Sequence, residues 1–173
     1  MRFLLIILML SSLALSKTTE EKLKKYNQYD DIFLKYEKEF GISYFLMKSI
    51  ALTENEKFDH KAIMKNSNGT VDIGLMQINS MWKKWLPEAG ITKEKLKDPD
   101  FNIKVAYMIV SKIIEKHGYT WDSIGRYHSG TPKFKERWLN KMKQNVSYLA
   151  SIDKRVIRSE NSFEITKKNI TNK

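Results

Sequence analysis

The chain has no cysteine, and its seven glycines form neither a glycine-rich linker nor an internal repeat. Without cysteine there is no disulfide and no thiolate metal site, so the packing of apolar side chains must stabilise the fold. The apolar run at residues 3–15 is 13 residues long, shorter than the roughly 20 residues that a membrane-spanning helix needs. No cysteine follows it to carry a lipid, so we expect no stable membrane anchor.

The N-terminus has the pattern of a secretory signal peptide. Arg2 precedes the apolar run, and Ala14-Leu15-Ser16 places small residues at −3 and −1. We expect cleavage after Ser16 and a periplasmic or extracellular location, with an uncleaved anchor as the alternative. We expect one folded domain over residues 17–152, followed by a basic tail over residues 153–173.

The formal charge of the chain is +11, and +10 without Arg2. Such a charge favours an acidic partner, which can be nucleic acid, anionic lipid or an anionic cell-wall polymer. The lysines are spread along the chain, so any single one belongs most simply to a solvated surface. Export makes nucleic acid the least suitable of the three partners.

The three histidines, His60, His117 and His128, do not have the spacing of metal ligands, and no H-E-x-x-H motif occurs. We therefore expect neither a metal nor another cofactor.

The hydrophobic pattern predicts a mainly helical chain. The capping-box pattern Thr18-x-x-Glu21 predicts a polar helix that runs to Phe40. An amphipathic helix is expected to begin after Ser43 and to end at Glu54. Residues 55–71 have no long period, which predicts a loop.

Two later helices are marked by a cap followed by proline, at Asp98-Pro99 and Thr131-Pro132. The first should end at Gly118, and Thr120 should open a short helix between the two. The side chains that the last helix is expected to turn inward are Phe134, Trp138, Leu139, Met142, Val146 and Leu149.

Glu54 is the candidate general acid. A helix C-terminus carries partial negative charge, and together with apolar neighbours it would raise the pKa of a carboxyl group. A carboxylic acid that stays protonated near neutral pH is what cleavage of a glycosidic bond needs. Taken alone, however, an exposed glutamate at a helix end is the simpler interpretation.

The motifs around Glu54 change that interpretation. The segment SIALTENEKFDHKAIMKNSNGTVDIGLMQINSMWKKWL, the later DPDFNIKVAYMIVSKIIEKHG and RYHSG at residues 126–130 follow one another in order. Together they resemble the lytic transglycosylase domain, a bacterial relative of goose-type lysozyme. In that family a helix ends in a catalytic glutamate, and G-L-M-Q-I, D-P-x-x-N-I and A-Y-N-A-G follow. The resemblance covers roughly residues 30–140.

The resemblance implies an all-α, lysozyme-like domain with at most a small β-hairpin around residues 69–78. It implies cleavage of the MurNAc–GlcNAc β-1,4 bond of peptidoglycan, with one glutamate as general acid and then as base, and with a 1,6-anhydro product. Small single-domain members associated with secretion and pilus systems share DIGLMQINS, so such an assembly machine is a candidate partner. We expect a monomer that acts on peptidoglycan glycan strands.

By this resemblance, Gly74, Leu75, Met76 and Gln77 line the glycan cleft opposite Glu54. Glycine lets the backbone pass close to a sugar. Methionine suits an apolar sugar face, and the glutamine amide both donates and accepts hydrogen bonds. For Leu75, plain core packing is the preferred interpretation.

Two aromatic residues also match the family. Tyr127 stands at the tyrosine of A-Y-N-A-G, whose hydroxyl lies near the catalytic acid and would orient Glu54. Tyr107 matches an aromatic residue of the long helix that approaches the same cleft.

Three positions depart from the family pattern. Asn55 replaces the serine that usually follows the glutamate, and His128 and Ser129 replace the asparagine and alanine of A-Y-N-A-G. These changes put the secondary hydrogen bonds in doubt. They also put the pH profile in doubt, because an imidazole can titrate near neutrality.

Other functions stay open. A second carboxylate in the cleft would indicate a lysozyme-type hydrolase, and the candidates are Glu56, Asp59 and Asp72, although Asp72 more simply holds the turn by hydrogen bonds to local backbone. A non-catalytic wall-binding assembly factor of the same fold is a further alternative. Charge alone supports a basic binder of nucleic acid or lipid.

Overall fold

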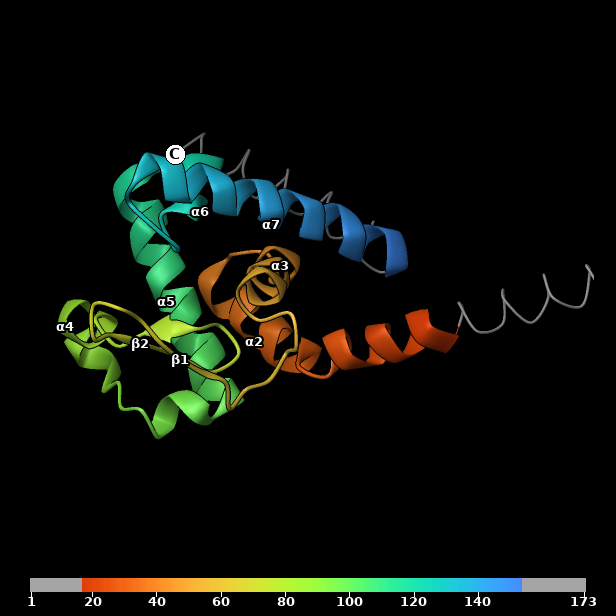
Figure 1. The fold of residues 1–173 in the computed structure, drawn as a ribbon, viewed down its shortest axis with the longest axis horizontal. Coiled ribbons are helices and arrows are strands. Elements are labelled where there is room, and N and C mark those ends of the chain that lie inside the picture. The colour runs from red at the N-terminus through yellow and green to blue at the C-terminus, as the bar shows by residue number, and fades with distance from the viewer. Residues whose placement is uncertain (1–16, 154–173) are drawn as a thin grey trace, which may run out of the picture.

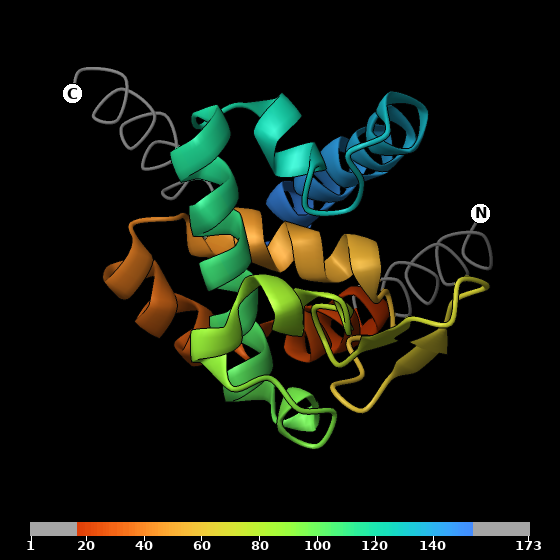
Figure 2. The same cartoon turned by 90° about the vertical axis from the view of Figure 1, so that its left-hand side faces the viewer.

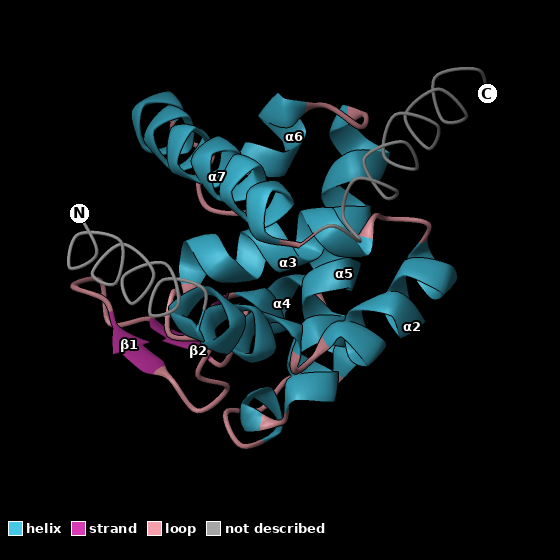
Figure 3. Cartoon of the chain, turned by 90° about the vertical axis from the view of Figure 1, so that its right-hand side faces the viewer, coloured by secondary structure: helices cyan, strands magenta, loops and turns pink. Residues whose placement is uncertain are grey.

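The computed structural model describes residues 17–153, which form a helical body with one small sheet at its side (Figure 1). The predicted signal peptide and the predicted tail, except for Asp153, lie outside these residues. Strands take up little of the chain (Figure 3), so the predicted all-α, lysozyme-like fold class is confirmed. In chain order, the elements are α2 (Asp30–Phe40), α3 (Tyr44–Glu54), β1 (Ile63–Lys65), β2 (Val71–Ile73), β3 (Ile78–Asn79), α4 (Trp82–Trp85), η1 (Pro87–Ala89), η2 (Lys95–Lys97), α5 (Pro99–His117), α6 (Trp121–Gly125) and α7 (Pro132–Ile152).

Helix α3 is central and is buried on every side, whereas an amphipathic helix was predicted. Residues 44–53 are all buried, and α2 and α7 pack against them. The hydroxyls of Ser49 and Thr53 donate to the carbonyls of Phe45 and Ser49, at 2.8 and 2.7 Å. Because these polar groups find partners within the helix, they can be buried without a large penalty.

The predicted N-terminal helix is interrupted. Residues 17–27 are helical, residues 28–29 form a turn, and α2 begins at Asp30. Asn27 and Asp30, on the two sides of the turn, both accept a hydrogen bond from the Nζ of Lys48. No glycine or proline marks this break, so the sequence pattern did not predict it.

The predicted ends of later helices are confirmed. Asp98 caps α5, its Oδ1 accepting the Phe101 N–H at 2.8 Å, and Gly118 follows the last residue of α5. Thr120 caps α6, and Pro132 begins α7. One predicted inward position of α7 is wrong: Phe134 is 55% exposed, and its neighbour Lys135 is the buried residue of the first turn.

The sheet is larger than the predicted hairpin. Strands β1, β2 and β3 form an antiparallel sheet in that order, with Ile63 opposite Ile73 and Asp72 opposite Asn79. Strand β1 lies in the segment predicted as a loop. All three of its residues are exposed, so no alternation of apolar residues could reveal it. The turn after β2 lies at the C-terminal end of α3, where the Asn55 amide donates to the Gly74 carbonyl.

Candidate functional site

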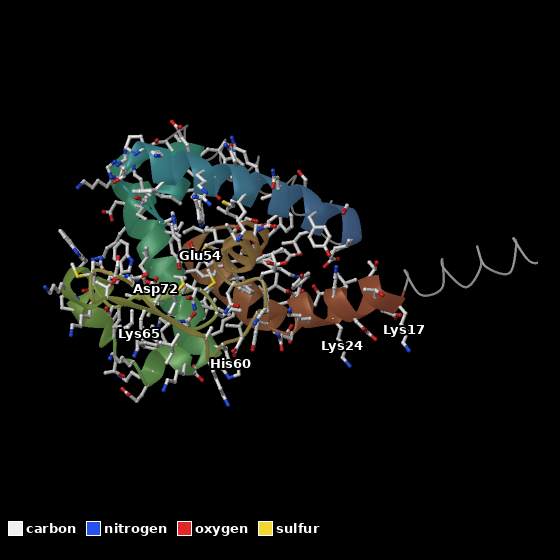
Figure 4. The ribbon with its side chains drawn as sticks, in the orientation of Figure 1. Lys17, Lys24, Glu54, His60, Lys65 and Asp72 are labelled. Carbon is white, nitrogen blue, oxygen red and sulfur yellow. The ribbon has the colours of Figure 1, made fainter. Side chains whose placement is uncertain are left out.

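A cleft of about 820 Å³ lies between two walls and contains Glu54. The sheet and α4 form one wall, and α5 with the connection from α6 to α7 forms the other. Figure 2 shows α3 running between the sheet and α7. In Figure 4, Glu54 and Asp72 point into the region between these parts, and both side chains line the cleft.

Glu54 occupies the last position of α3, and its side chain is 13% exposed. Helix α7 holds this end of α3: the Lys141 Nζ donates to the Thr53 carbonyl at 2.9 Å, and the Asn145 amide donates to the Thr53 hydroxyl at 3.0 Å. A lysine that reaches the last carbonyls of a helix is a favourable cap. The carboxyl group is thus carried by a rigid buried helix and opens onto the cleft.

Asn55, the first departure from the family pattern, joins the end of α3 to two later turns of the chain. Its amide donates to the Asp59 carbonyl at 2.7 Å and to the Gly74 carbonyl at 3.4 Å. The asparagine therefore supplies hydrogen bonds that tie Glu54's neighbour to the turn at Gly74.

The turn at residues 74–77 is fixed by Asn102, a fully buried residue of α5. Its Oδ1 accepts the Met76 N–H at 2.7 Å, and its Nδ2 donates to the Ile73 and Leu96 carbonyls, both at 2.9 Å. Gly74 has φ +81°, and a Cβ atom there would collide with Asn102 and Leu96. Glycine at this position is therefore required by packing inside the protein, since Gly74 does not line the cleft.

Three predicted cleft residues lie in the core instead. The side chains of Leu75, Met76 and Tyr107 are completely buried and do not line the cleft. The Tyr107 hydroxyl donates to the Phe33 carbonyl at 2.9 Å, and burial raises its pKa above the usual value. Core packing, the interpretation preferred for Leu75, thus applies to Met76 and Tyr107 as well. Met76 lies in the turn that Asn102 anchors, and Tyr107 is tied to the core by its hydrogen bond to Phe33.

Gln77 and Tyr127 do line the cleft. Gln77 has φ +47°, and its amide donates to the Gly74 carbonyl at 2.8 Å, which closes the turn. The Tyr127 hydroxyl donates to the Met76 carbonyl at 2.8 Å. A phenol has one proton to donate, so it does not donate to Glu54 at the same time. Burial, followed by the charges of Glu54 and Asp72, raises the pKa of Tyr127 well above its usual value, which keeps this proton in place.

Asp72 is held by side chains rather than by the local backbone that was expected to hold it. Its Oδ2 accepts from the Asn66 amide at 2.8 Å, and its Oδ1 accepts from the Asn79 amide at 2.6 Å. Both asparagines line the cleft as well. The result is a second carboxylate in the cleft with both oxygens engaged by carboxamides.

His128 lies next to Glu54. Its Nδ1 is 3.4 Å from the Glu54 Oε1, and its ring stacks on Trp138, with centroids 5.7 Å apart and planes 7° apart. The stack fixes the imidazole against α7. The second departure from the family pattern therefore places an ionisable ring beside the candidate acid.

Sequence analysis did not identify several cleft residues. The cleft is also lined by Trp82, Trp85, Lys112 and Lys116. These residues lie within the segments that carry the family resemblance, but no function was predicted for them. The part of Asn102 in holding the turn was also missed, although the D-P-x-x-N-I motif contains this residue.

Within residues 17–153, no helix is both long and apolar enough to cross a membrane. No group of three or more histidine, aspartate or glutamate side chains is arranged there to hold a metal ion.

Comparison with known proteins gives consistent matches. The model of the transglycosylase SLT domain family matches residues 31–149. Invasion protein IagB of Salmonella typhimurium (strain SL1344) is 38% identical over 124 residues, which cover 69% of this chain and 77% of that protein. Protein IpgF of Shigella flexneri is 32% identical over 121 residues, covering 69% and 74%. A peptidoglycan-binding-like protein of Escherichia coli O157:H7 is 36% identical over 98 residues, covering 53% and 59%.

The resemblance predicted from the motifs is thus confirmed. The matched region spans well over half of the chain and includes α3, the sheet, α5 and most of α7. This protein belongs to the transglycosylase SLT domain family.

Proposed function

We propose that the protein is a peptidoglycan lytic transglycosylase that cleaves the MurNAc–GlcNAc β-1,4 bond and leaves 1,6-anhydroMurNAc ends. The observation that carries this proposal is the position of Glu54: a largely buried carboxyl group at the end of a rigid helix, opening onto a cleft of about 820 Å³. Family membership supports the same reaction class.

In the proposed mechanism Glu54 acts twice. As general acid it protonates the glycosidic oxygen that leaves with GlcNAc, while the acetamido group of MurNAc supports the positive anomeric carbon. As general base the resulting carboxylate takes the proton of the muramoyl 6-hydroxyl, whose oxygen bonds to the anomeric carbon. The proton on Glu54 is restored and no water is consumed. The 6-hydroxyl belongs to the same sugar, so its effective concentration is high.

The remaining residues would position substrate and acid. Gln77 presents its amide at the cleft, and the Tyr127 hydroxyl holds the Met76 carbonyl, which fixes the turn beneath. His128, 3.4 Å from Glu54, would stabilise the carboxylate form between the two steps when its ring is protonated.

The rival with specific support is a lysozyme-type hydrolase, because Asp72 lines the same cleft. The hydrogen bonds from Asn66 and Asn79 to both of its oxygens favour a structural part in the sheet over the activation of water. The non-catalytic alternative is disfavoured because the acid and the cleft are both present.

Product analysis separates these functions. Purified protein is incubated with sacculi in water enriched in oxygen-18, and the new ends are identified by mass. We expect anhydromuramoyl ends, lighter by one water and free of the label. Labelled reducing ends would establish a hydrolase, and no new ends at all would favour the non-catalytic alternative.

We also propose export to the periplasm or the exterior, and action at a secretion or pilus assembly machine. Support comes from the apolar N-terminal segment and from the similarity to a protein named as an invasion protein. Cell fractionation with mass analysis of the mature N-terminus tests the location, and cross-linking in cells tests the partner. Recovery in the cytoplasm with an intact N-terminus would contradict the proposed location.

A further inference from the structure

The Glu54 carboxyl group lacks the partner that the family resemblance gives it. That resemblance implies that the Tyr127 hydroxyl orients the acid, but this hydroxyl donates its one proton to the Met76 carbonyl at 2.8 Å. Among the ion pairs of residues 17–153, the one that reaches Glu54 joins its Oε1 to the His128 Nδ1, 3.4 Å away. The imidazole is therefore the group in place to hold the acid.

The His128 ring is ordered by its stack on Trp138 of α7. The ring centroids are 5.7 Å apart, and the planes are 7° apart. Trp138 is buried, and it also packs against Tyr127, with centroids 6.4 Å apart. A ring that lies flat on a buried indole has little freedom to tilt, so the stack keeps the imidazole beside Glu54. A site residue whose rotamer is locked by packing in this way can hold its neighbour in one geometry.

Other charged groups near Glu54 and His128 do not pair with them. Six of these groups line the same cleft: Asp72, Lys112, Glu115, Lys116, His117 and Arg126. Asp72 accepts from two asparagine amides, and Lys112 and Arg126 each pair with a carboxylate at 3.0 Å. On α7, the Lys141 Nζ donates to a backbone carbonyl of α3 at 2.9 Å. Within residues 17–153, no other charge lies within ion-pair distance of either member of the pair.

We propose that His128 is a positioning residue for Glu54 and that this pair sets the upper pH limit of the reaction. The Nδ1–H of the ring holds Oε1, so the acidic proton is carried by Oε2 and faces the leaving oxygen. A distance of 3.4 Å suits this role, since catalytic hydrogen bonds are often long before substrate binds. This inference rests on the proposed function, because it concerns how the same acid works.

The pair also responds to pH as a unit. An imidazole titrates near neutrality, so the first proton that the pair takes up is bound at a higher pH than a carboxyl group alone would allow. The protonated ring then stabilises the carboxylate that forms when Glu54 gives its proton to the leaving oxygen. The protein should therefore keep its activity to a higher pH than a variant with a neutral side chain at position 128.

Two substitutions separate the orienting contact from the titration. His128→Asn introduces the residue of the family pattern, whose amide can donate a hydrogen bond but cannot take up a proton. His128→Leu removes both properties. His60→Asn is the matched control, because His60 is bonded to the Tyr29 hydroxyl, does not line the cleft and lies away from Glu54 (Figure 4).

The measurement is the rate at which new muramoyl ends appear in sacculi, from acidic to alkaline pH, for each variant. We expect His128→Leu to lower kcat by about 10²-fold with little change in KM, because the acid is misplaced. His128→Asn should be about ten-fold less active than the wild type at neutral pH and should approach it at mildly acidic pH. His60→Asn should keep the wild-type pH profile per folded molecule. A loss in His128→Asn that is the same at every pH, or a wild-type kcat in His128→Leu, would overturn the inference.

Nuclear magnetic resonance gives a readout that does not depend on activity. The chain has three histidines, and the spectrum of His128→Asn identifies the signal of the His128 ring. In Glu54→Gln protein this ring should lose its proton at lower pH than in the wild type, because the imidazolium has lost a carboxylate neighbour. The His60 signal should not change. Identical titrations of His128 in the two proteins would overturn the inference. Titrations that differ in a protein that makes no new ends from sacculi would support the pair and overturn the proposed function alone.

Discussion

Helix α3 carries two ionisable side chains whose surroundings are opposite. The Lys48 side chain is 1% exposed; its Nζ lies 2.8 Å from the Asp30 Oδ1 and 3.9 Å from the Asp153 Oδ2, and it also donates to Asn27. Glu54, six residues later, opens onto the cleft, with His128 at 3.4 Å.

The comparison distinguishes Lys48, whose charge stabilises the fold, from Glu54, whose carboxyl group is accessible from the cleft. A buried ammonium needs several acceptors to offset the loss of water, and Lys48 finds them on three different segments. It thereby joins the N-terminal helices and the end of α7 to α3. Glu54 lines the cleft, and the hydrogen bonds from α7 hold the end of its helix through Thr53 rather than through its carboxyl group.

The strongest way to break this contrast is Glu54→Gln. The amide has almost the same shape but cannot donate a proton to the leaving oxygen, so we expect activity to fall by about 10³-fold or more. The thermal unfolding midpoint and the circular dichroism spectrum should stay the same. Clearing of sacculi at the wild-type rate would remove Glu54 from the mechanism.

Asp30→Asn should lower stability and leave the chemistry of Glu54 unchanged. It removes the carboxylate at 2.8 Å from the buried Lys48 Nζ, whereas Asp153 lies at 3.9 Å, so the free energy of unfolding should fall by about 3 kcal/mol. Urea denaturation measures this loss. Asp31→Asn, at the exposed neighbouring position, is the control and should cost less than about 0.5 kcal/mol. Similar losses in the two variants would show that the Lys48 cluster contributes little.

Gly74→Ala tests the turn that separates core from cleft. Gly74 and Gly69 both have φ +81°, but a Cβ on Gly74 would lie 2.7 Å from the Asn102 Cγ, whereas one on Gly69 meets nothing within 4 Å. We expect Gly69→Ala to cost about 1 kcal/mol of stability for its backbone conformation alone, and Gly74→Ala at least about 2 kcal/mol. Activity per folded molecule should fall only for Gly74→Ala. Equal costs would mean that Asn102 moves aside easily.

The smallest effect is expected from Tyr127→Phe, with Tyr107→Phe as its match. Each hydroxyl donates to a buried carbonyl, at 2.8 and 2.9 Å, so each change should cost about 1 kcal/mol. Only Tyr127 lines the cleft, so only its loss should also lower kcat, by a few-fold. A matching fall in kcat for Tyr107→Phe would place that residue in the catalytic machinery after all.

Much of the fold could be predicted because its signals are local. Helix α5 begins at the cap Asp98 and the proline at position 99, and it ends before Gly118. Each of these signals acts on backbone groups within one turn of itself. The end of α3 at Glu54 was predicted too, but the side chains that hold it, Lys141 and Asn145, come from α7 and lie far away in the sequence. Two features have no local signal and were not predicted: the break between helices at residues 28–29 and strand β1, whose residues are all exposed.

Within the site, the residues 70–79, TVDIGLMQIN, show where sequence stops being sufficient. The sequence by itself determined that a glycine, a methionine and a glutamine follow one another near a helix-terminal glutamate. Tertiary structure decided which of them faces the cleft: Asn102, 26 residues after Met76, binds the Met76 N–H, and the Met76 side chain lies in the core, while Gln77 lines the cleft. The same applies to the cleft walls, where α4 and α5 combine an indole and an ammonium group that belong to no shared motif. How deeply a side chain is buried, and which way it points, depends on contacts with distant parts of the chain. The spacing of residues within one segment therefore cannot predict either.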